Sequence, residues 1–301
     1  MPAASPQSEA TRGGVAAAAG FLCWGIVPIY WKALAAVPAL ELIAHRVVWS
    51  LLFLLAVQAW RGRLGALRDG LATPRAIGLN LLSSVLLGAN WTVYVWGVNS
   101  GHVIECSLGY FLTPLGNVAL GYVFLHERLR PLQWTAIGFA AAGVLLLLLR
   151  LGHVPWIALA LAGTWSSYAI LKKQSQLGPM NGLTVETILL FPVAAGALVW
   201  WHFSGVGALG RVGPGDHALI LSAGVITAVP LLLFAQGAQR VRLSTLGLLQ
   251  YLSPSVQFGL GVFVYDEPFD AARLQAFAVI WTGLLLYTAD GFWSQRRRLF
   301  A

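Results

Sequence analysis

Charged residues are scarce in this 301-residue chain, where they make up 10% of positions while hydrophobic residues make up 58%. An ordinary soluble domain carries about 25% charged residues. A water-soluble globule of this size could not bury so much apolar surface, so the composition excludes that class and indicates lipid as the solvent. The 13 Trp agree with this interpretation, because indole rings favour the lipid–water interface.

Cysteine is rarer still, with two residues in the chain. Cys23 and Cys106 both lie in apolar segments and form neither a metal-ligand spacing nor a disulfide framework, so we expect no metal and no cofactor. The chain also lacks a phosphate loop, an HExxH motif, a serine elbow and the paired aspartates of an intramembrane protease. These absences predict that the protein is not an enzyme.

The hydrophobic residues are grouped in stretches long enough to cross a bilayer, which requires about 20 apolar residues in a helix. Ten stretches are predicted to be transmembrane helices, at residues 14–32, 40–60, 76–98, 103–125, 131–150, 154–172, 182–203, 216–238, 243–265 and 271–292. The connections are too short to hold a soluble domain. Residues 1–13 are predicted to be a disordered tail and residues 293–301 a basic cytoplasmic tail.

Basic residues mark the cytoplasmic side of a membrane protein. One side of the ten-helix arrangement receives fourteen of them, which are Arg12, Arg61, Arg63, Arg68, Arg75, Arg128, Arg130, Lys172, Lys173, Arg240, Arg242, Arg296, Arg297 and Arg298. The other side receives four, which are Lys32, Arg150, Arg211 and Arg273. This asymmetry predicts that both termini are cytoplasmic. It also argues against nucleic acid as a partner, since the charge is spread along one membrane face.

An internal repeat relates the two halves of the chain. Residues 97–129, shifted by 140 positions onto 237–269, give seven identities in 33 positions, among them two Gly, one Pro and one Glu. Within this segment YFLTP at 110–114 faces QYLSP at 250–254. We therefore expect two related halves.

Each predicted repeat, 14–150 and 151–292, contains five helices. An odd number forces the second copy to enter the membrane from the opposite face, which gives an inverted-topology repeat of the kind that many secondary transporters use. The predicted fold class is thus an all-α membrane protein with ten transmembrane helices in two inverted five-helix repeats. A symmetric scaffold without transport is the alternative.

Ionisable side chains within a membrane span are costly and are candidates for functional sites. His45 and Arg46 lie in the outer part of the second predicted helix, and Glu186 lies in the cytoplasmic part of the seventh. A shift of 141 positions places Trp24 on Trp165 and His45 on Glu186. We expect His45 and Glu186 to line one central cavity from opposite ends, with pairing between helices as the alternative. No basic residue in its own helix can neutralise Glu186.

Polar and aromatic side chains also form stripes on single helix faces. Asn90 and Tyr94 are four residues apart in the third predicted helix, and Tyr110 and Asn117 are seven apart in the fourth. Such stripes suit a solvated pathway, although polar contacts between helices are equally compatible with them. The predicted substrate-binding residues are His45, Arg46, Asn90, Trp91, Tyr94, Tyr110, Asn117, Tyr168, Glu186, Gln250 and Tyr251.

Several of these stretches resemble the RarD branch of the EamA family, in the drug/metabolite transporter superfamily. The similarity runs from about residue 14 to about residue 292 and is carried by GFLCWGIVPIYWK (20–32), ELIAHRVVWS (41–50), the segment 88–129 and RLSTLGLLQYLSPSVQF (242–258). The resemblance implies ten helices, cytoplasmic termini and a central cavity between inverted halves. It also implies export or exchange of small molecules, driven by a gradient rather than by ATP.

We therefore expect a secondary transporter, acting as an exporter or exchanger, that moves a small polar or amphipathic metabolite or drug across a bacterial inner membrane by alternating access. The expected partners are the lipid bilayer, the small-molecule substrate and a coupling proton, which Glu186 could carry. A lipid-handling flippase or scramblase and a non-transporting scaffold or sensor remain as alternatives.

Overall fold

The computed structural model describes residues 6–149, 153–265 and 271–299, and within these ranges it contains helices and loops without a strand. The α-helices are α1 (Pro6–Ala33), α2 (Ala39–Trp60), α3 (Pro74–Asn99), α4 (Val103–Leu125), α5 (Pro131–Leu148), α6 (Trp156–Gln174), α7 (Pro179–Phe203), α8 (Pro214–Arg240), α9 (Leu243–Gln250), α10 (Leu252–Phe263) and α11 (Ala271–Leu299). Two short 3-10 helices, η1 (Leu64–Leu71) and η2 (Ala208–Gly210), lie in connections.

Each predicted span corresponds to one helix, except the ninth, which is formed by α9 and α10 together. The interruption falls at Tyr251, three residues before Pro254, because proline cannot continue the backbone hydrogen-bond ladder. The equivalent Pro114 lies inside α4 without a break. Among the described residues, seven helices (α1 to α5, α7 and α8) are long and apolar enough by composition to cross a membrane. The predicted all-α, ten-span membrane fold is confirmed.

The sequence also explains where several helices begin and end. Proline stands at the start of α3, α5, α7 and α8, where its missing N–H costs nothing. Thr73 caps α3 by accepting a hydrogen bond from the Ala76 N–H at 3.1 Å. At the end of α4, His126 adopts a left-handed conformation with φ 52°, and the next N–H bonds back to Gly121.

The terminal segments differ from the prediction. Helix α1 begins at Pro6, so residues 6–13 of the predicted disordered tail are helical. Glu9 explains the difference, since it stands in the first turn of the helix and pairs with Arg240 of α8 at 2.8 Å. At the other end α11 continues to Leu299 through the predicted tail. Glu267, which the shift of 140 positions places on Glu127, lies outside the described residues.

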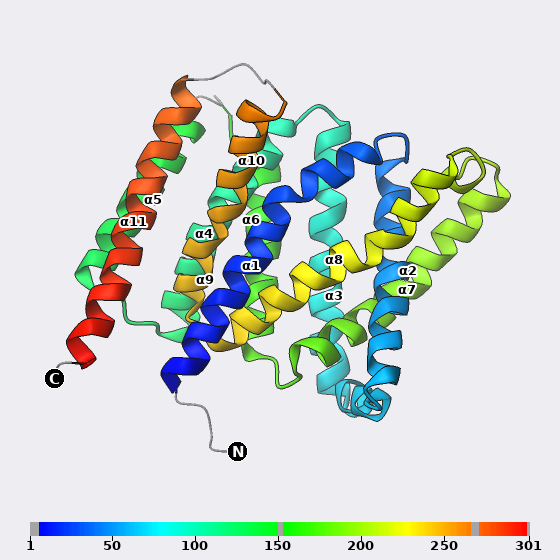
Figure 1. Cartoon of the computed structure of the whole chain (residues 1–301), viewed down its shortest axis with the longest axis horizontal. Helices are drawn as coiled ribbons and strands as arrows, with labels where there is room; N and C mark the ends of the chain where they lie inside the picture. Colours follow the sequence, from blue (N-terminus) through cyan, green and yellow to red (C-terminus); the bar gives the residue numbers. More distant parts are fainter. Residues whose placement is uncertain (1–5, 150–152, 266–270, 300–301) are drawn as a thin grey trace.

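The contacts between the helices follow the repeat, and Figure 1 shows how the helices are arranged. Helix α1 packs on α8 as α6 packs on α3, and α4 packs on α6 as α9 and α10 pack on α1. The pairs α2–α7, α4–α9 and α5–α11 each join equivalent helices of the two halves. The ends of α1 and α11 that carry the chain termini lie on the same side, at the bottom of Figure 1.

Glycine allows the two halves to approach closely. A Cβ on Gly224 of α8 would overlap the backbone of Trp49 in α2, and the Ser50 hydroxyl donates to the Gly224 carbonyl at 3.0 Å. A Cβ on Gly247 of α9 would likewise meet the carbonyl of Pro114 in α4. Close helix contacts in membranes depend on small residues. These two crossings therefore fix the orientation of one half relative to the other.

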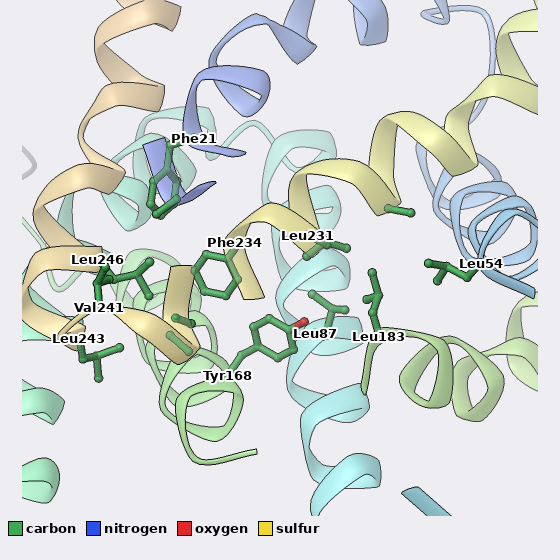
Figure 2. Packing of buried hydrophobic residues seen from close by; sticks show 14 residues of the cluster. Phe21, Leu54, Leu87, Tyr168, Leu183, Leu231, Phe234, Val241, Leu243 and Leu246 are labelled. Carbon is green, nitrogen blue, oxygen red and sulfur yellow. The ribbon is translucent and has the colours of Figure 1, made fainter. Parts of the chain in front are cut away.

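The largest buried apolar cluster of the described residues lies between the halves, towards the cytoplasmic ends of the helices. Figure 2 shows how its side chains pack. The cluster joins α1, α2 and α3 of the first half to α6, α7, α8 and α9 of the second, and its largest members are Phe21, Leu54, Leu87, Tyr168, Leu183, Leu231, Phe234, Leu243 and Leu246. We call it the cytoplasmic plug. It closes the bundle on the side where the sequence predicts the cytoplasm.

Candidate functional site

A central cavity of about 180 Å³ lies between the two halves. Helices α1 to α4 of the first repeat and α6, α8, α9 and α10 of the second all contribute to its wall. Its position between the repeats is the place where transporters built from inverted repeats hold their substrates.

The cavity occupies the half of the bundle away from the chain termini. Trp31 is two residues from the end of α1, and Arg46 is within two turns of the start of α2. Tyr94 and Tyr110 lie near the α3–α4 connection, with 37% and 38% of their surface exposed. The charge asymmetry of the sequence predicts that this half faces outward.

Aromatic rings form the floor of the cavity. Trp24 and Trp165, the pair superposed by the repeat, meet edge to face with ring centroids 5.3 Å apart. Both also pack against the cytoplasmic plug, and each ring lies within 5.8 Å of Phe234 in that cluster. The same side chains thus separate the cavity from the cytoplasmic half of the bundle.

Among the described residues of the cavity wall, Arg46 carries a formal charge. Its guanidinium carbon lies 4.4 Å from the ring centroid of Trp91 and 4.9 Å from that of Trp31, so the cation is flanked by two indole rings. Its Nε donates to the Thr227 hydroxyl of α8 at 3.0 Å. Three helices therefore hold the guanidinium in place.

Other polar groups of the wall combine access to the cavity with contacts between helices. The ring centroids of Tyr94 and Tyr110 are 5.6 Å apart. The Asn90 amide donates to the Leu161 carbonyl at 3.0 Å and to the Thr164 hydroxyl at 2.9 Å, which ties α3 to α6. The alternative considered for the polar stripes was hydrogen bonding between helices. It holds for the amide nitrogen of Asn90.

Six of the eleven predicted residues line the cavity, namely Arg46, Asn90, Trp91, Tyr94, Tyr110 and Gln250. The structure brings them together from α2, α3, α4 and α9. That they contact a substrate stays a prediction.

The other five predicted residues lie elsewhere. Asn117 is buried between α4 and α9, where its amide donates to the Gln250 side chain at 3.2 Å. The Tyr251 hydroxyl donates to the Phe111 carbonyl at 3.1 Å, and Tyr168 is enclosed in the cytoplasmic plug. These three side chains serve the contacts between helices that support the cavity wall.

The expectation that His45 and Glu186 line one cavity from opposite ends is wrong for this structure. Adjacent residues of a helix point about 100° apart, so the face that presents Arg46 to the cavity turns His45 away. His45 is 1% exposed and lies 3.7 Å from Glu41, whose carboxylate accepts from the Ala208 N–H.

Glu186 is sealed in the cytoplasmic half of the bundle. Its carboxylate lies 2.6 Å from the Lys172 amine and accepts hydrogen bonds from Ser83 at 2.5 Å and from Tyr168 at 3.2 Å. The neutralising cation comes from α6, and the hydroxyl of Ser83 comes from α3 of the other repeat. The prediction considered only the helix that carries Glu186 and so missed this partner.

Trp31 and Thr227, which position Arg46, were not predicted as site residues. Thr227 lies 181 positions from Arg46 in the chain, and no local pattern connects the two. Trp31 is one of 13 Trp residues, and tryptophan is common at membrane interfaces, so its sequence position alone did not single it out. For Trp24, in contrast, its match to Trp165 in the repeat was a usable signal.

Fold and cavity together define an integral membrane protein of two inverted five-helix repeats with a central site. Residues 11–149 match the EamA-like transporter family. A protein of Vibrio cholerae serotype O1, named an uncharacterized transporter, is 41% identical, with coverage of 95% of this chain and 94% of that protein. The protein RarD of Streptomyces exfoliatus is 43% identical, with coverage of 91% and 87%. The chain therefore belongs to the EamA-like transporter family and to its RarD branch.

A solved crystal structure has the same fold. It superposes with a TM-score of 0.73 over 95% of this chain and 98% of its own, at 21% sequence identity. At this identity the likeness concerns the arrangement of the helices alone.

Proposed function

We propose that this protein is a secondary transporter that moves a small polar or amphipathic molecule by alternating access about the central cavity. The observation that carries the proposal is the asymmetry of the interface between the repeats, which holds a cavity on one side and the cytoplasmic plug on the other. Because the halves are related by inversion, the opposite packing would close the outer side and open the inner one.

The Glu186 cluster supports this proposal. It bonds α6 and α7 of the second repeat to Ser83 of α3 in the first, and its groups are buried. Opening the cytoplasmic side would break these bonds. The cluster is therefore a contact specific to the state in which the cytoplasmic side is closed. Two-state elements of this kind are what alternating access requires.

We further propose that transport is export or exchange across the inner membrane of a bacterium, driven by a solute or proton gradient. The named relatives come from bacteria, and the chain has no phosphate loop that would bind a nucleotide. A proton could be carried by Glu186 in the state that exposes it to the cytoplasm.

Flux measurements test the proposal. Purified protein in proteoliposomes is supplied with labelled amino acids, nucleosides and amphenicols, with and without an imposed pH gradient. We expect protein-dependent flux of a member of one class, faster with the gradient. An identical rate with and without the gradient would remove proton coupling and leave transport standing.

A matched pair of variants ties the flux to the cavity. Tyr94→Trp adds bulk to the cavity wall, whereas Tyr122→Trp makes the same change on α4 outside the cavity, at a tyrosine that is 51% exposed. We expect the first to slow flux and the second to leave it near the wild-type rate. Equal rates for the two variants would contradict a route through the cavity.

The alternatives have their own signatures in the same vesicles. Phospholipid scrambling without solute flux would identify a lipid-handling flippase. Absence of flux for every solute, together with a cellular phenotype that Glu186→Gln leaves unchanged, would identify a scaffold or sensor.

A further inference from the structure

Among the described residues, the lining of the cavity contains one cation and no acidic side chain. Of the described residues that line it, Arg46 is the side chain that carries a formal charge, and no described Asp or Glu forms an ion pair with it. The buried carboxylates of the described residues are already engaged. Glu41 accepts from the Ala208 N–H, Glu105 accepts from the Ile157 N–H, and Glu186 pairs with Lys172.

The geometry of the guanidinium leaves one edge free. Trp31 and Trp91 flank the group, and its Nε is bonded to Thr227. The two terminal nitrogens of Arg46 have no hydrogen-bond partner among the described residues. Their N–H groups are the donors with which an arginine binds both oxygens of a carboxylate. A cation in a membrane interior is costly when it is left without an anion, so this edge favours an anionic ligand.

The rest of the cavity wall is aromatic and contains further hydrogen-bond donors. Gln250 accepts from Asn117 through its carbonyl oxygen, which leaves its amide N–H groups without an acceptor among the described residues. Tyr94 and Tyr110, whose hydroxyl groups can also donate, line the wall as well. The cavity thus offers donors to an anionic head and ring faces to an apolar body.

We propose that the cavity binds a small organic monoanion, with a carboxylate on the free edge of Arg46 and an aromatic or unsaturated body among the indole and phenol rings. A single cation balances a monoanion and leaves a dianion, such as a phosphate ester, undercompensated. A cavity of about 150 Å³ binds benzene in a soluble protein. The volume here, about 180 Å³, therefore suits one ring with a carboxylate. The ligand is a substrate only if the proposed transport function holds, whereas the binding site stands without it.

Binding of three probes that share one phenyl ring and differ in charge tests this inference. Benzoate, benzamide and benzylamine are titrated into the full-length protein in lipid nanodiscs by isothermal calorimetry. Benzoate should bind about tenfold or more tightly than benzamide, since a hydrogen bond to a charged group is worth at least that ratio. Benzylamine should bind most weakly. Equal affinities for benzoate and benzamide, tighter binding of benzylamine, or no binding of benzoate would each overturn the inference.

A pair of arginine variants locates the effect. Arg46→Gln should bring the affinity for benzoate down to that for benzamide. Arg211→Gln makes the same change at an exposed arginine on the same membrane side and should keep the preference. Persistence of the preference in Arg46→Gln would overturn the assignment. If that variant does not fold, judged by size-exclusion chromatography, the comparison of probes on the wild-type protein still decides.

Failure of this inference is distinguishable from failure of transport. Benzoate binding without flux of any solute in proteoliposomes would refute transport and keep the anion site. Flux of neutral or cationic solutes, with no preference for benzoate in the binding experiment, would keep transport and refute the anion site.

Discussion

Replacement of Lys172 by methionine should destabilise the protein strongly. Lys172 and Glu186 have 4% and 1% of their side-chain surface exposed, and their charged atoms are 2.6 Å apart. Removal of one partner from such a pair typically costs about 3–5 kcal/mol, because the other charge stays buried without compensation. The hydrogen bonds from Ser83 and Tyr168 would remain on the carboxylate and place the expected loss at the lower end of this range.

The assay is equilibrium unfolding of the purified protein in mixed micelles with increasing sodium dodecyl sulfate. A double-mutant cycle adds Glu186→Gln and the combined variant. The combination should lose less stability than the sum of the single changes, because it leaves no unpaired charge. Arg12→Met is the control, since the ion pair of Arg12 with Glu9 is exposed, at 70% and 40%, and should contribute less than about 1 kcal/mol.

Two results would refute this reasoning. Unfolding of Lys172→Met at the wild-type concentration of detergent would mean that the ion pair contributes no stability. Strict additivity in the cycle would mean that Lys172 and Glu186 do not interact in the folded protein.

Two further predictions concern the helix contacts and use the same unfolding measurement. Gly224→Ala should lower stability by about 1–3 kcal/mol, because its Cβ overlaps the Trp49 backbone, whereas Gly163→Ala, with no atom within 4 Å, should be neutral or slightly stabilising; equal effects would contradict the close crossing of α2 and α8. Glu127→Ala should cost about 1–3 kcal/mol, because its carboxylate accepts from the Leu243 N–H at 2.6 Å at the start of α9. Glu127→Gln keeps one acceptor oxygen and should lose less, and a larger loss in Glu127→Gln would contradict this capping role.

Helix positions could be predicted from the sequence because hydropathy and proline act locally. A bilayer demands about 20 apolar residues per helix, and proline stands at the first position of α3, α5, α7 and α8. The start of α1 was missed because the ion pair of Glu9 with Arg240 joins residues that are 231 positions apart in the chain. A short polar segment without that contact would indeed have little reason to form a helix.

For the cavity residues as well, local features could be predicted from the sequence and distant contacts could not. Tyr94 and Tyr110 were predicted from polar stripes, since helical periodicity shows which residues share a face. Periodicity does not show which neighbour that face meets. His45 and Glu186 were therefore expected in the cavity, although the packing of the helices buries both side chains in interfaces between helices.

The sequence by itself determined the solvent, the number of spans, the repeat and its inversion, because each follows from composition, helix length and an odd number of helices. The tertiary structure decided which side of the interface between the halves is hollow and which is filled. Rotation of each helix is set by contacts such as that of Gly224 with Trp49, which are distant in sequence. That rotation placed Arg46 alone in an aromatic cavity and paired Glu186 with Lys172 outside it.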